Sequence, residues 1–330
     1  MIYLKVQKVD AEIMRIKLLR ESLLHPNYDI FSSGNYVYFP LKSYIKTNYE
    51  IVNIEGKIRK KKYTPYDKIL ELLNIDDSTK MNIPSYWEKF GNVVLIKMND
   101  CPENYKKKIG EAFAKVLNAK SVLLYKGVKG EFREPIVEFI YGNDPITTHI
   151  ENGIFYRFDA SKIMFSSGNV DERIRMSKID CVDETVIDMF AGIGYFSLPI
   201  AKYCFPKKVI AIEKNEYSFK FLLENKKINN VEMDTILSDN RELNLKDVGD
   251  RIIMGYIHTR EFIPYAIKML KHKGILHYHD TWRKEEVLES EEIIKQLFGD
   301  YYYQILRFHV VKNYAPKIFH ISLDIKIRKV

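Results

Sequence analysis

The chain has 330 residues, 46% hydrophobic and 29% charged, a balance that favours two or three folded domains over long disordered segments. A formal net charge of +8, together with 23 tyrosines and 18 phenylalanines, favours a polyanionic partner, nucleic acid before a membrane surface. No run of 18 apolar residues and no signal-peptide pattern occur, so we expect a cytoplasmic protein without membrane contact.

Residues 1–60 are predicted to form a small α/β domain. A helix is indicated by apolar residues at helical spacing, namely Ile13, Ile16, Leu19 and Leu23. A loop with turn residues, "HPNYDIFSSGN", and a strand, "YVYFPL", follow. Five of the six residues at 57–62, "KIRKKK", are basic, and we interpret this run as a solvated linker or a phosphate-contacting arm. Residues 61–81 are predicted to be a basic and helical linker.

Residues 82–164 are predicted to form a second α/β domain. An amphipathic helix is expected in "NYKKKIGEAFAKVLN". Strands, indicated by β-branched and aromatic residues, are expected before it in "NVVLIKM" and after it in "SVLLYK", "PIVEFIYG" and "TTHIENGIFYRFD".

Residues 165–330 alternate between strands and helices, which predicts a parallel sheet with helices on both faces. The helices are expected in "YFSLPIAKY", "EYSFKFLLENKKINN" and "EFIPYAIKMLKHKG". A closing antiparallel hairpin is expected at "KNYAPKIFHISLDIKI". The predicted fold class is therefore α/β, and ligands should lie beyond the carboxyl ends of the parallel strands.

A small-residue turn follows the first of these strands, in "VIDMFAGIGYFSLPIAKY" at residues 186–203. Asp188 ends the strand, and Gly192 and Gly194 allow a tight turn and the close approach of a ligand to the backbone. The turn lacks the third glycine of a dinucleotide fingerprint, and an aspartate suits a pyrophosphate poorly. Both features fit a cofactor that carries an ammonium and a sulfonium group.

Polar side chains also end the next two strands. Glu213 is placed to accept hydrogen bonds from two ribose hydroxyls, and Asp239 and Asn240 to meet an adenine ring. The pattern resembles the class I fold of transferases that depend on S-adenosylmethionine (SAM), a Rossmann-like catalytic domain, here preceded by smaller α/β domains. This resemblance implies SAM as the cofactor, held by Ser166, Asp188, Phe190, Ala191, Gly192, Gly194, Glu213, Lys214, Asp239 and Asn240.

Longer motifs resemble the Trm5/TYW2 family of SAM-dependent enzymes that modify position 37 of tRNA. The matching segments are "GEFREP", "THIENGIFYRFDASKIMFSSGNVDERIRM" and "GDRIIMGYIHTREFIPYAIKMLKHKGILHYHDT", and the resemblance extends over residues 85–330. It implies a tRNA partner, tRNA-Phe by expectation, bound at its anticodon loop by a monomeric enzyme. The target is then the purine on the 3′ side of the anticodon.

The same resemblance implies catalytic roles for Arg133, Glu172 and Arg173. In the guanine-N1 branch of the family, the carboxylate corresponding to Glu172 accepts a proton. Guanine N1 is protonated at neutral pH, so a carboxylate that removes this proton and an arginine that stabilises charge on O6 suit that reaction.

The chain departs from the guanine-N1 branch at the end of the fourth strand. Where that branch has an Asn-x-Pro motif, this sequence has Met254, Gly255 and Tyr256, and "MFSSGN" replaces its Ser-Pro-Arg segment. Gly255 leaves room for a larger base, and Tyr256 offers a face for stacking. Residues 1–60, however, resemble the extra N-terminal domain of the Trm5 branch.

This combination suggests the archaeal Trm5a group. We therefore expect methylation of C7 of the tricyclic wyosine intermediate imG-14, with guanine-N1 methylation as a second reaction. One alternative is TYW2-type transfer of the 3-amino-3-carboxypropyl group of SAM to the same base. Another alternative is a tRNA-binding protein without catalysis.

No metal site is expected. His277 and His279 alternate on one strand with no evident third ligand, and we interpret them as strand packing or as polar contacts beside the cofactor. The cysteines at 101, 181 and 204 have neither metal-site nor redox-pair spacing.

Overall fold

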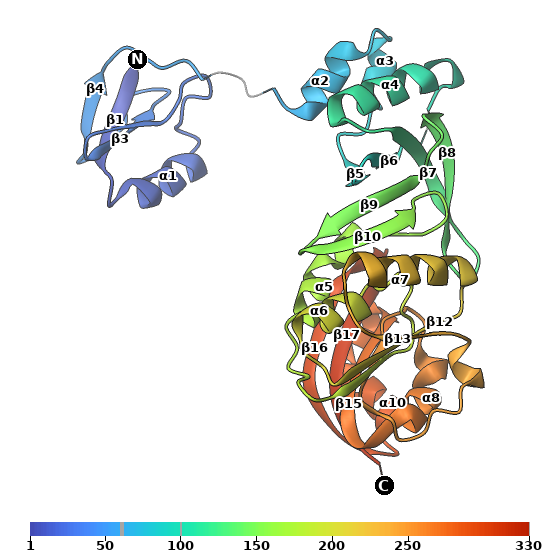
Figure 1. Cartoon of the computed structure of the whole chain (residues 1–330). Helices are drawn as coiled ribbons and strands as arrows, with labels where there is room; N and C mark the ends of the chain where they lie inside the picture. Colours follow the sequence, from blue (N-terminus) through green and yellow to red (C-terminus); the bar gives the residue numbers. More distant parts are fainter. Residues whose placement is uncertain (60–62, 100, 330) are drawn as a thin grey trace. The chain divides into compact units, whose positions relative to one another are not determined.

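The computed structural model describes residues 1–59, 63–99 and 101–329, which fall into two compact units, Met1–Asp67 and Lys68–Val330 (Figure 1). Most of the predicted basic run lies at 60–62, outside the described residues. In the part of the chain that the structure describes, no helix is long and apolar enough to cross a membrane.

The first unit is an antiparallel sheet, in the order β2-β3-β1-β4, with one helix packed on it. Its elements are β1 (Ile2–Gln7), α1 (Ala11–Arg20), β2 (Phe31–Ser33), β3 (Tyr36–Pro40) and β4 (Glu50–Asn53). The predicted apolar face of the helix is wrong, since Ile13 is 74% exposed and Ile16 and Leu19 are also exposed. The helix instead packs through Ala11, Met14 and Leu18, a second stripe with helical spacing.

The second unit begins with a smaller α/β part. Its elements are α2 (Pro65–Leu72), within which the boundary between the units falls, α3 (Asp77–Met81), β5 (Trp87–Phe90), β6 (Val93–Ile96), η1 (Glu103–Tyr105), α4 (Lys106–Leu117), β7 (Ser121–Lys129) and β8 (Glu134–Tyr141). The sheet order is β5-β6-β7-β8, and β6 and β7 are parallel because α4 connects them as a crossover. The strands and the helix that the sequence predicts here are confirmed.

A hairpin of β9 (Ile146–Glu151) and β10 (Ile154–Asp159) follows, and then η2 (Ser167–Asn169) and α5 (Val170–Met176). In Figure 1 the hairpin lies beside α7 (Glu216–Ile228).

Two buried asparagines, Asn225 in α7 and Asn229 directly after it, join that helix to the free edge of β10. Asn225 accepts from the backbone N–H of Arg157 (2.7 Å) and donates to its carbonyl (3.1 Å). Asn229 makes the same pair of bonds with Phe155, at 2.9 and 2.7 Å. The two side chains therefore satisfy backbone groups that a neighbouring strand would otherwise pair.

The rest of the second unit is built on a seven-stranded sheet in the order β13-β12-β11-β14-β15-β17-β16. The first five strands in this order are parallel, and β17 and β16 are antiparallel. The strands are β11 (Thr185–Asp188), β12 (Lys208–Glu213), β13 (Asp234–Leu237), β14 (Gly249–Met254), β15 (Leu270–Arg283), β16 (Tyr302–Ala315) and β17 (Ile318–Arg328). The predicted alternation, parallel sheet and closing hairpin are confirmed.

Helices cover both faces of this sheet. Alternate residues of the parallel strands face two separate hydrophobic clusters, Val186 and Ile253 in one, Ile187 and Ile252 in the other. The further helices are α6 (Ser197–Tyr203), η3 (Asn240–Glu242), η4 (Arg260–Phe262), α8 (Ile263–Met269), α9 (Lys284–Leu288) and α10 (Ser290–Phe298). The helix predicted to reach Gly274 ends at Met269, because the residues that follow begin β15.

The asparagine contacts predict a large effect of one substitution. Asn225→Ala removes the partners of both Arg157 backbone groups and of the Ile193 carbonyl. We expect a loss of about 3 kcal/mol in the stability of the second unit, since each unpaired buried polar group costs about 1–3 kcal/mol. Urea denaturation followed by circular dichroism measures it, with Lys227→Ala on the exposed side of α7 as the control. Equal midpoints for the two variants would contradict the prediction.

Candidate cofactor and substrate site

A cavity of about 650 Å³ lies where the parallel strands β11 to β14 end. Its walls also include residues 131–133, 162–169 and 312–314. The predicted site residues on its lining are Arg133, Ser166, Arg173, Phe190, Gly192, Glu213, Lys214, Asp239, Asn240, Gly255 and Tyr256. The predicted residues that do not line it are Glu172, Asp188, Ala191 and Gly194. The structure thus brings most of the predicted set together at the sheet edge.

The glycine turn after β11 has two different uses. Gly192, with a φ of +58°, turns its N–H toward Glu213 Oε2 at 2.7 Å. Gly194, with a φ of +100°, has no room for a side chain, because a Cβ there would lie 2.5 Å from Leu198. The expectation that both glycines let a ligand approach is therefore corrected for Gly194, which serves the packing of the turn on α6.

Glu213 ends β12 and faces the cavity. Each of its oxygens accepts one backbone N–H, Oε2 from Gly192 and Oε1 from Asn215, both at 2.7 Å. Burial raises the pKa of the Glu213 carboxyl above its usual value. Since a carboxylate can accept about four hydrogen bonds, its fixed oxygens keep capacity for two ligand hydroxyls.

Two buried oxygens near the turn lack protein partners. Asp188 Oδ2 and Asn240 Oδ1 have no hydrogen bond among the described residues, although Asp188 Oδ1 accepts from Phe190 N–H. Burial raises the pKa of Asp188 to about 7. Asn240 lines the cavity and donates to the Met189 carbonyl at 2.5 Å, so its free oxygen can accept from a ligand. Asp188 lies beneath the turn, away from the lining, which differs from its expected ligand contact.

Asp239 is already paired with cations at the cavity wall. Arg241 binds both of its oxygens, at 2.7 and 2.9 Å, and Lys214 lies 3.0 Å away. The Arg241 guanidinium holds the pKa of the Asp239 carboxyl well below its usual range. Lys214 also contacts Glu131 at 3.0 Å. Of the two predicted adenine-binding residues, Asn240 therefore has the available acceptor.

A cationic group that the sequence interpretation missed lines the same cavity. Lys312 of β16 donates to Ser166 Oγ at 2.7 Å, and burial lowers the pKa of its ammonium to about 8. A Cβ at Gly168 would lie 3.2 Å from Lys312 Nζ. The small residues of "MFSSGN" thus leave room for the Lys312 side chain, and this run of small residues was the one sign of it in the sequence. Arg133 lies nearby, with its guanidinium 5.4 Å from the Tyr314 ring centre.

Gly255 leaves no empty space. A Cβ there would lie 2.6 Å from the Phe196 ring, so the missing side chain lets this ring pack on the backbone. Phe196 lines the cavity and stacks on His279, with ring centres 5.4 Å apart. Tyr256 stacks on Phe190 at 5.5 Å. The expectation that room at Gly255 accommodates a larger base is corrected, because an aromatic side chain fills that room.

Arg173 and Glu172 are adjacent in α5 but take different surroundings. Arg173 forms a bidentate pair with Glu151 at 2.5 and 2.8 Å and donates to the Ser166 carbonyl, which fixes the cavity wall. Glu172 is 3% exposed and lies in a buried polar network. Its partners are Arg175, at 2.7 and 3.0 Å, and Ser322 Oγ, at 2.8 Å.

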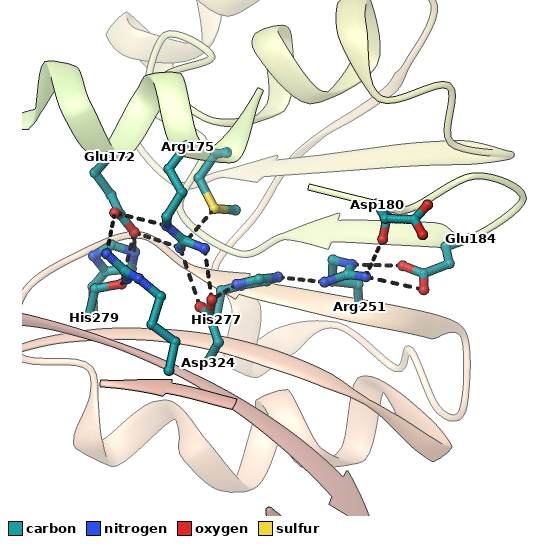
Figure 2. A network of polar contacts seen from close by, with 11 residues as sticks. Glu172, Arg175, Asp180, Glu184, Arg251, His277, His279 and Asp324 are labelled. Carbon is teal, nitrogen blue, oxygen red and sulfur yellow. Dashed lines mark hydrogen bonds and ion pairs between the residues drawn. The ribbon is translucent and has the colours of Figure 1, made fainter. Parts of the chain in front are cut away.

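This network continues along the sheet (Figure 2). Arg175 also binds Asp324 at 2.7 Å, and Asp324 contacts His277 Nδ1 at 2.6 Å. His277 Nε2 lies 2.9 Å from Arg251, which pairs with Glu184 at 2.7 Å.

Burial alone would raise the pKa of Glu172, but the Arg175 guanidinium holds it at about 2. The interpretation of His277 as strand packing is confirmed, and no cluster of three metal-type ligands occurs within residues 1–59, 63–99 and 101–329.

Three family models match successive parts of the chain. The Trm5 N-terminal domain matches residues 4–50, the TYW2 N-terminal domain matches residues 68–145, and the TRM5/TYW2 methyltransferase domain matches residues 147–301.

The chain is similar to characterised archaeal proteins of two kinds. It is 44% identical to the tRNA(Phe) (4-demethylwyosine(37)-C(7)) aminocarboxypropyltransferase of Pyrococcus horikoshii, over 75% of this chain and 91% of that protein. It is 32% identical to the tRNA (guanine(37)-N(1))-methyltransferase Trm5b of Pyrococcus abyssi, over 98% of each chain.

A solved structure agrees with this similarity. P. horikoshii TYW2 in complex with MeSAdo superimposes with a TM-score of 0.71 and 41% identity, over 80% of this chain and 100% of that one. Since sequence, domain order and fold agree, the chain belongs to the TRM5/TYW2 family of SAM-dependent transferases.

Proposed function

We propose that this protein transfers the 3-amino-3-carboxypropyl group of SAM to C7 of the tricyclic wyosine intermediate at position 37 of tRNA. The observation that carries the proposal is the 44% identity to an aminocarboxypropyltransferase, which extends over 91% of that enzyme. The methyl transfer expected from the sequence has weaker support, because the methyltransferase Trm5b is only 32% identical.

The residues of the cavity fit SAM. Glu213 would bind the ribose hydroxyls, and the unpaired oxygen of Asn240 would accept from the adenine amino group. Gly192 lines the same wall, and its missing side chain leaves room for the Tyr195 ring, which lies 2.7 Å from where a Cβ would be. When bound, SAM supplies a carbon made electrophilic by its bond to a positively charged sulfur.

The surroundings of Glu172 support a carbon nucleophile over guanine N1. N1 methylation needs a base that takes the N1 proton. Glu172 does not line the cavity, its carboxylate is bound by Arg175 and Ser322, and its pKa is held at about 2. A carboxylate so weakly basic removes that proton poorly. A carbon of an electron-rich ring attacks without losing a proton first, so C7 chemistry does not require this step.

The first unit and the net charge support tRNA as the partner. Residues 4–50 match a Trm5 N-terminal domain, and the formal charge of the chain is +8. Lysines and arginines that neutralise phosphates bind RNA with an affinity that falls as salt is added. The tRNA is of the phenylalanine type, as for the P. horikoshii relative.

The mass of the product tests this proposal. The full-length protein is incubated with SAM and either of two tRNAs, one with the tricyclic intermediate at position 37 and one with guanosine. We expect the first tRNA to gain an aminocarboxypropyl group, detected by mass spectrometry of its nucleosides, and the second to gain none. A gained methyl group on the tricyclic base would instead support the methyltransferase alternative, and no modification of either tRNA would support the non-catalytic one.

Glu213→Gln tests the cofactor end of the site. The amide has one acceptor oxygen, so it cannot bind the two backbone N–H groups and also accept from ribose hydroxyls as a carboxylate does. We expect SAM affinity to fall by about 1–3 kcal/mol, which calorimetry measures directly. The matched control is Glu216→Gln, an exposed glutamate in the first turn of α7. If both variants bind SAM equally well, Glu213 is not a ligand.

A further inference from the structure

His320 connects the cavity to the buried network of Glu172. It lies near the start of β17, paired with Thr281 of β15 and Lys312 of β16. Because β17 runs antiparallel to β15, its first residues lie at the edge where the parallel strands end. His320 lines the cavity there and is only 5% exposed.

Three side chains form a line from the cavity into the protein. His320 Nε2 lies 3.1 Å from His279 Nδ1, and His279 Nε2 lies 3.4 Å from Glu172 Oε1. The second distance exceeds that of a normal hydrogen bond, but the contact is still electrostatic. This order of groups resembles the arrangement in which a buried carboxylate orients one imidazole and stabilises its charged form.

The ionised Glu172 determines which ring nitrogens carry protons. The Glu172 carboxylate repels the lone pair of an unprotonated ring nitrogen. His279 therefore carries its proton on Nε2, which faces Glu172, and its Nδ1 remains an acceptor. His320 must then donate its own Nε2–H to His279 Nδ1. The Nδ1 of a neutral His320 is consequently an unprotonated nitrogen. No hydrogen bond to this atom occurs in the described part of the chain.

His277 shows the contrast within the same network. Its Nδ1 is bound to Asp324 and its Nε2 to Arg251, so both nitrogens are used in holding the sheet together. His320 has only one nitrogen engaged in this way, and its ring lies on the cavity lining.

His320 lines the same cavity as Phe196 and Tyr256. Phe196, which covers Gly255, stacks on His279, and the ring centres of His279 and His320 are 5.3 Å apart. A base that enters the cavity near Phe196 and Tyr256 therefore meets the wall that contains His320.

We propose that His320 is the catalytic base that removes the proton from C7 of the target ring, oriented by His279 and Glu172. The inference rests on the proposed function. C7 bonds to the sulfonium-bound carbon of the aminocarboxypropyl chain, and the broken carbon–sulfur bond leaves its electron pair on sulfur. The hydrogen on C7 then leaves as a proton to His320 Nδ1, and its bonding electrons restore the aromatic ring.

The charges around His320 suit this step. Burial, followed by the proximity of His279, Lys312 and Arg133, lowers the pKa of His320 to about 3, while Glu172 acts in the opposite sense. The imidazole is therefore neutral and able to accept a proton in the resting enzyme. A ring carbon that has gained a substituent but kept its hydrogen is strongly acidic, so a weak base suffices. The same neighbouring cations favour release of the proton afterwards.

His320→Gln tests the proposal, because a glutamine amide can still donate to His279 but offers no basic nitrogen. We expect the single-turnover rate on tRNA carrying the tricyclic intermediate to fall about a hundredfold or more, with SAM affinity unchanged by calorimetry. His309→Gln, an exposed histidine on the neighbouring strand β16, should retain the wild-type rate. A folded His320→Gln protein that retains the wild-type rate would overturn the proposal.

Two further measurements separate a base from a merely structural residue. Added imidazole should restore part of the rate of His320→Ala, and it should not accelerate the wild type. Nitrogen-15 NMR of the protein without ligands should show His320 protonated at Nε2 and bare at Nδ1; the opposite tautomer would contradict the inference. If the wild-type product carries a methyl group, the proposed function fails, whereas the rate ratio still reports on His320.

Discussion

The buried carboxylate of Glu172 is the constraint around which the catalytic part of the chain is organised. A carboxylate removed from water must be neutralised and hydrogen-bonded, and Arg175, Ser322 and the His279 ring meet that need. These partners come from α5, β17 and β15, so the ion pair joins the cavity wall to the antiparallel end of the sheet. Since Arg175 also binds Asp324, the polar layer continues to the far side of β15 (Figure 2).

The sequence was sufficient to predict the architecture and the site residues at the ends of the parallel strands. Alternating apolar segments and the acids at strand ends predicted the parallel sheet and the position of Glu213, because both depend on local periodicity and on the geometry of parallel strands. Lys312 and His320 were missed, since they enter the site from antiparallel strands that no motif marks. The helix face in residues 11–20 was misjudged because two apolar stripes fit the same helix and only tertiary packing selects one.

The two kinds of relatives match different extents of the chain, and the structure gives this division a physical meaning. The similarity to the aminocarboxypropyltransferase is higher but covers 75% of the chain, whereas the similarity to Trm5b is lower and covers 98%. The first unit has its own core of Leu4, Val6, Leu18, Phe39 and Leu41. A unit with a separate core can be kept or lost in evolution without altering the packing around the cavity.

The pair of asparagines at the end of α7, Asn225 and Asn229, has a consequence for solubility. A strand at the border of a sheet presents bare amide and carbonyl groups, and such a border recruits strands from other molecules. On β10 the side chains of Asn225 and Asn229 occupy alternate backbone positions, at Arg157 and Phe155, as the main chain of another strand would. The β10 edge of the hairpin is thereby closed to intermolecular strand addition, and its resistance to aggregation depends on a helix remaining docked.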